Sequence, residues 1–223
     1  FGDFDDSQSS WSPDGSHVAF VSNRTEQPDR NRNTDIWLVD TTEANPAPQQ
    51  LTFSPHQDAS PTWSRDGKLL AYTTAASSDL PIYAIPQLAI LDVASGETRS
   101  VESLAEVQVY NLIFSQNRSE LLAITEFQGQ QQLIRVDLET HAVKQMVGQQ
   151  DVVREFDEAA DGLIYALVDR PRYPGEIFRT DEKGNLQQIS LIQDDVLAGT
   201  KFGAVQKHRF ESEPGVTIEA FYL

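Results

Sequence analysis

Short apolar runs, each about as long as one β-strand, recur along the whole chain. In most of them every position is apolar, rather than every second one, as expected of strands buried on both faces between stacked sheets. Turn-forming Gly, Pro, Asn and Asp separate the runs, and no segment keeps an apolar period of about 3.6 residues. The clearest runs are residues 18–21, 36–39, 69–72, 88–91, 121–124, 133–136 and 163–167. The pattern predicts an all-β fold with few or no helices.

Two of the runs follow the same turn motif, and the two copies are 52 residues apart. The first is Trp-Ser-Pro-Asp-Gly at residues 11–15, and the second is Trp-Ser-Arg-Asp-Gly at residues 63–67. In such a turn proline fixes φ, aspartate binds nearby backbone amides, and glycine accepts a positive φ. Weaker copies follow. In all four units a later apolar run ends in aspartate, which predicts a structural turn role for Asp40, Asp92, Asp137 and Asp181.

Internal similarity at a period of roughly 40–50 residues, with about four strands in each unit, indicates β-propeller blades. We predict four four-stranded blades in residues 1–200, at about 9–59, 60–109, 110–153 and 154–200, with the motif tryptophan between neighbouring blades. Closed propellers have about 4–8 blades. The chain does not begin with methionine, so part of a larger ring is preferred over a very small ring. Residues 201–223 break the rhythm and predict a hairpin that would lead into a further domain.

The composition narrows the range of partners. Asp and Glu total 34 against 17 Lys and Arg, giving a formal net charge of −17. Such a chain repels phosphate backbones and anionic lipids, which argues against nucleic acid and membrane partners. The absence of cysteine excludes disulfides, thiol nucleophiles and thiolate metal sites. No signal peptide is visible, but a cleaved one leaves no trace, so the compartment stays open, with cytoplasm preferred and periplasm as the alternative.

The histidines predict neither a metal site nor a cofactor. They are scattered singly, and none has a second histidine or a carboxylate at a metal-like spacing. The four are His17, His56, His141 and His208.

Positive charge gathers in two loops, each of which joins the second and third strands of a predicted blade. The candidate binding residues there are Arg24, Arg30 and Arg32 in the first blade and Arg170 and Arg172 in the fourth. A guanidinium group suits a peptide carboxylate or acidic groups on a docked domain. The alternative is a solvated loop in which the arginines of the first blade pair with Asp29 and Asp35. The matching loop of the second blade, residues 79–86 with Tyr83, is apolar and either packs on a partner or extends the strands.

Several of these segments together resemble a known family. The motif at residues 11–15, the strand end at 22–24, the run at 35–40 and Gln-Leu-Thr at 50–52 resemble the repeats of TolB-like propellers. They equally resemble the N-terminal propeller of the prolyl oligopeptidase family, particularly its acylaminoacyl-peptidase-like branch. The resemblance covers residues 9 to about 190. Residues 210–221 resemble the segment that leads into the α/β-hydrolase domain of that branch, with Pro214 where the family usually has aspartate.

The resemblance implies a parent serine peptidase whose propeller docks on the hydrolase domain and admits only short, unfolded peptides. The nucleophile of that family lies in a Gly-x-Ser-x-Gly elbow, and this pattern does not occur in the chain. We therefore assign no catalytic residue and expect the chain alone to be non-catalytic. An arc of blades with uncovered faces predicts self-association. The alternative is a TolB-like or WD-repeat-like propeller that binds another protein.

Overall fold

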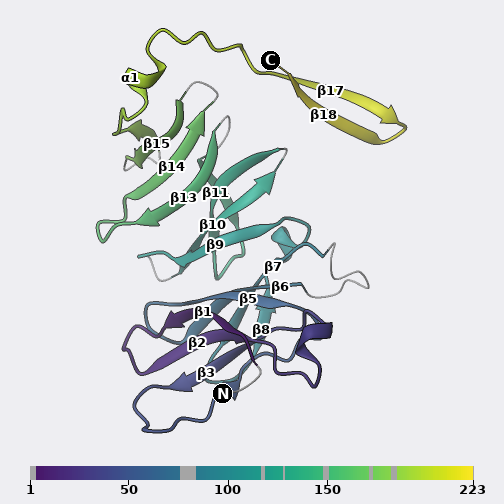
Figure 1. The fold of residues 1–223 in the computed structure, drawn as a ribbon, viewed down its shortest axis with the longest axis vertical. Coiled ribbons are helices and arrows are strands. Elements are labelled where there is room, and N and C mark those ends of the chain that lie inside the picture. The colour runs from purple at the N-terminus through teal and green to yellow at the C-terminus, as the bar shows by residue number, and fades with distance from the viewer. Residues whose placement is uncertain are drawn as a thin grey trace.

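The computed structural model describes residues 4–75, 84–116, 119–127, 129–147, 151–170, 173–181 and 185–222. Within these ranges the chain forms four four-stranded antiparallel sheets, a two-stranded sheet, one α-helical turn, α1 (Asp194–Leu197), and short 3-10 turns (Figure 1). The expected all-β fold is confirmed. No helix among these residues is long and apolar enough to cross a membrane.

Each four-stranded sheet is a meander in which consecutive strands pair. The first sheet contains β1 (Asp6–Trp11), β2 (His17–Ser22), β3 (Asp35–Asp40) and β4 (Gln49–Gln50). The second contains β5 (Asp58–Trp63), β6 (Leu69–Thr74), β7 (Gln87–Asp92) and β8 (Thr98–Ser100). The third contains β9 (Val109–Phe114), β10 (Glu120–Phe127), β11 (Gln130–Asp137) and β12 (Val143–Val147). The fourth contains β13 (Val152–Glu158), β14 (Ile164–Arg170), β15 (Tyr173–Thr180) and β16 (Leu186–Gln188).

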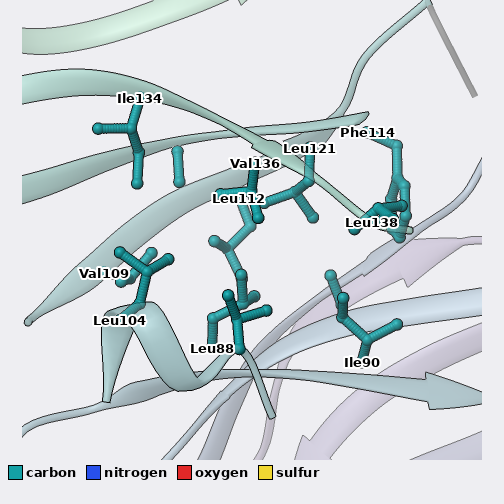
Figure 2. Close-up of a cluster of buried hydrophobic side chains, with 13 residues drawn as sticks. Leu88, Ile90, Leu104, Val109, Leu112, Phe114, Leu121, Ile134, Val136 and Leu138 are labelled. Atoms are coloured by element: carbon teal, nitrogen blue, oxygen red, sulfur yellow. The ribbon is translucent and has the colours of Figure 1, made fainter. Parts of the chain in front are cut away.

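The sheets stack in chain order, and an apolar cluster fills each of the three seams between neighbours. Figure 2 shows the middle seam, where Leu88 and Ile90 of β7 face side chains of the third sheet. Inner strands serve two seams at once: in β10, Leu121 packs into the middle seam and Leu122 into the next one. Because both faces of an inner strand are buried in this way, successive residues of its apolar run are all apolar.

The motif turns have the expected chemistry. Asp14 accepts hydrogen bonds from the Ser12 hydroxyl at 2.7 Å and from the Ser16 backbone amide at 3.0 Å. These bonds lower the pKa of Asp14 to about 2, the amide of Ser16 contributing most. Gly15 has a φ of 73°, which an L side chain adopts only with strain. The second copy repeats the arrangement around Asp66.

The aspartates that end the third strands also hold turns, as expected. Each accepts a hydrogen bond from a backbone amide two to four residues further along the chain. The pairs are Asp40 with Thr42 at 2.8 Å, Asp92 with Ser95 at 2.9 Å, Asp137 with Thr140 at 2.7 Å and Asp181 with Asn185 at 2.8 Å.

The two motif tryptophans occupy the same repeat position in different surroundings. Trp63 is 8% exposed, and its indole nitrogen donates to the carbonyl of Ser10 across the first seam at 3.1 Å. Trp11 is 62% exposed, because no sheet of the described residues covers that side of the first sheet. The expected packing of this tryptophan between sheets is therefore confirmed for Trp63 and wrong for Trp11.

The chain ends in a hairpin of β17 (Gln206–Glu213) and β18 (Val216–Tyr222), which extends away from the stacked sheets (Figure 1). Nearly all of its residues are exposed, and these include Phe210, Phe221 and Tyr222. The ring of Phe221 approaches the β10–β11 turn so closely that a Cβ on Gly129 would lie 3.0 Å from it. The hairpin thus contacts the third sheet and leaves several apolar side chains uncovered.

Candidate binding face

The loop between β2 and β3 lies between two cavities. The first, of about 560 Å³, is lined by Asp29, Arg30, Asn31, Arg32, Asn33, Pro55, His56 and Gln57. The second, of about 430 Å³, shares Asp29, Asn31, Arg32 and Gln57 with it and reaches Asp5 and Ser7 at the start of β1. Two connections, residues 23–34 and 51–57, therefore build one hollowed face at one end of the first sheet.

A network of asparagines fixes the shape of this loop. The Asn31 side-chain oxygen accepts from the Asn23 side chain at 2.8 Å and from the Asn33 backbone at 2.9 Å. Its amide nitrogen donates to the carbonyl of Gln27 at 2.8 Å. The Asn33 side chain donates to the carbonyls of Ser54 and His56, each at 2.9 Å, and so joins the two walls of the first cavity. The residues on either side of Asn31 are consequently held at the cavity mouth.

Those two residues are Arg30 and Arg32, and both are exposed. In the part of the chain that the structure describes, neither forms an ion pair with Asp29, Asp35 or another carboxylate. The pairing with Asp29 and Asp35 that the alternative of a solvated loop expected is therefore wrong, whereas the solvent exposure that it expected is present. The two guanidinium groups line the cavity together with one carboxylate, that of Asp29.

Arg24 lies elsewhere, on the uncovered side of the first sheet. Its guanidinium carbon is 4.6 Å from the centroid of the Trp37 ring, 5.2 Å from Phe4 and 5.5 Å from Phe20. Asp6 is its ion-pair partner at 3.4 Å. These contacts occupy the guanidinium within its own sheet, so the structure separates Arg24 from Arg30 and Arg32.

Arg170 is likewise bound to its own sheet. It forms two hydrogen bonds with the Asp151 carboxylate, at 2.7 and 2.9 Å, and lies 4.3 Å from the centroid of the Phe178 ring. The bonds with Asp151 raise the pKa of the guanidinium. The other two candidates, Arg172 and Tyr83, lie outside the described residues, as does most of the apolar loop at 79–86. Of the six candidates, the structure brings together Arg30 and Arg32.

Two carboxylates next to this face are buried, although the sequence analysis named only Asp35, and that as a partner of arginines in a solvated loop. Asp35 is 5% exposed and Asp58 is 0% exposed. Burial, and then the neighbouring Asp58, raise the pKa of Asp35 to about 7. Burial also raises the pKa of Asp58. The only sequence signal is an aspartate at the first position of two strands, β3 and β5, where solvent exposure would ordinarily be assumed.

The described residues contain no group of three or more His, Cys, Asp or Glu side chains placed to hold a metal ion.

Comparisons with known proteins show which folds this chain resembles. No protein-family model matches the chain. The uncharacterized peptidase YuxL of Bacillus subtilis is 27% identical over 94 residues, which are 42% of this chain and 13% of the relative. Acylaminoacyl peptidase of Pyrococcus horikoshii superposes with a TM-score of 0.73 at 15% identity, over 97% of this chain and 32% of the peptidase. TolB from Acinetobacter baumannii superposes with a TM-score of 0.63 at 18% identity, over 83% of this chain and 43% of TolB.

The chain therefore has the fold of the propeller portions of these peptidases and of TolB, and the resemblance expected from its repeats is confirmed at that level. It spans about a third of the length of the acylaminoacyl peptidase.

Proposed function

We propose that this chain is the propeller portion of a serine peptidase of the prolyl oligopeptidase family, similar to acylaminoacyl peptidases. In the parent protein it docks on an α/β-hydrolase domain and admits short peptides to the active site. The observation that carries the proposal is the extent of the superposition on the Pyrococcus peptidase. That superposition covers 97% of this chain, so the few residues left out are fewer than the hairpin of β17 and β18 contains, and the superposition must include part of the hairpin. The TolB superposition covers 83% of this chain.

The uncovered side of the first sheet supports a larger ring. Trp11 occupies there the position that Trp63 occupies in the first seam, and Phe20 and Trp37 lie on the same side. Stacked sheets bury such a side against another sheet. In the parent protein a further blade covers Trp11, and the exposed side chains of the hairpin pack on the hydrolase domain.

The role of Arg30 and Arg32 is to meet negative charge at the cavity mouth. A guanidinium pairs with a carboxylate through two parallel hydrogen bonds, and this pairing is stronger than one between neutral groups. The two arginines bind the carboxylate of a short peptide on its way to the active site. If they instead dock the hydrolase domain, their partner is an acidic patch on that domain.

The experiment compares two substrates in the natural enzyme: an acyl-peptide with a free C-terminal carboxylate and the same peptide as its amide. The Arg30→Ala/Arg32→Ala variant should lower kcat/KM for the free acid about 10- to 100-fold, as expected for losing charged hydrogen bonds. The amide should be cleaved as before. Arg99→Ala, which removes an exposed arginine from β8, is the matched control.

An equal loss for both substrates would mean that the arginines dock the hydrolase domain and do not select peptides. No loss for either would overturn their assignment. A natural protein without peptidase activity would overturn the proposed function and favour a TolB-like propeller that binds another protein, the reading supported by the TolB superposition.

A further inference from the structure

The two buried aspartates lie side by side in the first seam because the backbone places them there. The Asp58 amide donates to the carbonyl of Thr34 at 2.8 Å, and the Thr34 hydroxyl donates to the carbonyl of Asp58 at 2.8 Å. These two bonds join the start of β3 to the start of β5. Asp35, the residue after Thr34, thereby comes next to Asp58.

Three of the four carboxylate oxygens of this pair are buried without a hydrogen-bond donor. Asp35 Oδ2 accepts from the side-chain amide of Gln50 at 3.0 Å. Asp35 Oδ1 and both oxygens of Asp58 have no partner. The hydroxyls of Thr74, Thr52 and Ser54 lie near Asp58 but leave both of its oxygens without a hydrogen bond of normal geometry. Buried carboxylates without compensation are strongly disfavoured, and two adjacent ones more so.

The same repeat position in the fourth sheet shows that the fold can satisfy a carboxylate there. Glu176, at that position in β15, is fully buried. It accepts hydrogen bonds from the Ser190 hydroxyl and from the backbone amide of Gln193, the latter at 2.8 Å. The first sheet has Thr52 at the position of Ser190, and what distinguishes it is the second buried carboxylate, Asp58. The unsatisfied negative charge is therefore a property of the Asp35–Asp58 pair and not of the repeat position.

We propose that Asp35 and Asp58 together bind a hard cation of the calcium type, which bridges the first and second sheets. Carboxylate, hydroxyl and carbonyl oxygens are the ligands that Ca²⁺ prefers, and Ca²⁺ accepts irregular sets of them. The pair supplies three free oxygens, and the hydroxyls of Thr52 and Thr74 lie beside it. A third carboxylate is not required, because neutral oxygens complete such sites.

An ion at this place would stabilise the cavity lined by Arg30 and Arg32. Residues 55–57 line the cavity that carries Arg30 and Arg32, and the next residue along the chain is Asp58. Thr34, which is bonded to Asp58, ends the opposite wall of the loop. A bound cation would hold both walls together, so the cavity should be more rigid with the ion than without it.

The test uses the chain after treatment with a chelator, with Ca²⁺ or Tb³⁺ added back. Tyr72 is buried in the same seam, and burial, with smaller contributions from the two carboxylates, raises its pKa to about 12. Its ring is the intended sensitiser of terbium luminescence. We expect saturable luminescence that Ca²⁺ displaces. We also expect Ca²⁺ at about a hundred times its Kd to raise Tm by about 5–10 °C.

The variants locate the ion. Asp58→Asn keeps the side-chain shape and removes a buried charge, so it should fold and should lose both the luminescence and the Ca²⁺-dependent rise in Tm. Asp40→Asn changes the same residue type at the other end of β3 and should keep both responses. The proposal is wrong if the wild-type chain shows neither response, because the pair then holds a shared proton. It is also wrong if Asp58→Asn responds like the wild type, because the ion then binds elsewhere.

Discussion

The stacking of sheets predicts that one substitution, made at two equivalent repeat positions, has two different effects on stability. Trp63→Ala removes a side chain that is 8% exposed and packs in the seam between the first two sheets. Trp11→Ala removes the same side chain from the same position of the motif, where it is 62% exposed. Because chemistry and local turn are matched, the difference isolates the contribution of the neighbouring sheet.

The magnitude follows from the buried area. A tryptophan buries about 150–250 Å², which at about 25 cal/mol per Å² corresponds to about 4–6 kcal/mol. Measured losses for such core truncations are about 3–5 kcal/mol. Trp63→Ala also leaves the carbonyl of Ser10 without its hydrogen bond from the indole, worth about 1 kcal/mol. Trp11, being 62% exposed, buries about two-fifths as much surface as Trp63 and leaves no closed cavity, so its loss should be about 1.5–2.5 kcal/mol.

Urea unfolding followed by far-ultraviolet circular dichroism measures both losses without depending on the fluorescence of the deleted residue. We expect Trp63→Ala to lower the unfolding midpoint by about 1–2 M urea and Trp11→Ala to lower it by less than half as much. Equal midpoints for the two variants would refute the reasoning, since the seam would then contribute nothing that the uncovered side lacks.

Three further predictions concern single residues. In calcium-free buffer, the free energy of unfolding should fall as pH rises from about 4 through about 7, because folding raises the pKa of Asp35 from 3.8 to about 7 and the folded chain holds that proton more tightly. The difference between the urea midpoints at pH 5 and pH 8 should be smaller in Asp35→Asn than in the wild type. The carboxyl of Asp14 should titrate in NMR spectra at a pKa of about 2, and a value near 4 would contradict the turn geometry. Gly15→Ala should cost about 1–2 kcal/mol from backbone strain alone, as its Cβ would meet no atom within 4 Å, and an unchanged urea midpoint would contradict this.

Strands and turns could be predicted from the sequence because their causes are local. The Asp14 turn depends on residues within a few positions of one another, and so does the turn at Asp40. The double-sided apolar runs likewise predicted stacking, because a strand that is apolar on both faces needs a neighbour on each. These features needed no knowledge of distant parts of the chain.

The environments of individual side chains could not be predicted, because they depend on contacts between distant segments. Trp11 and Trp63 each begin a Trp-Ser-x-Asp-Gly turn, and the presence of an adjacent sheet distinguishes their environments. Arg24 resembled a binding residue until the structure placed aromatic rings around it. Asp35 and Asp58 become a pair through the backbone bonds of Thr34, which no local pattern indicates.

The central claim, that this chain is the propeller portion of a serine peptidase, has a direct test in the natural source. An antibody to the chain would capture the natural protein after labelling with a fluorophosphonate, which reacts with an activated serine. We predict a labelled species of about three times 24.9 kDa, because the chain spans 32% of the Pyrococcus peptidase. An unlabelled species of 24.9 kDa would contradict the claim.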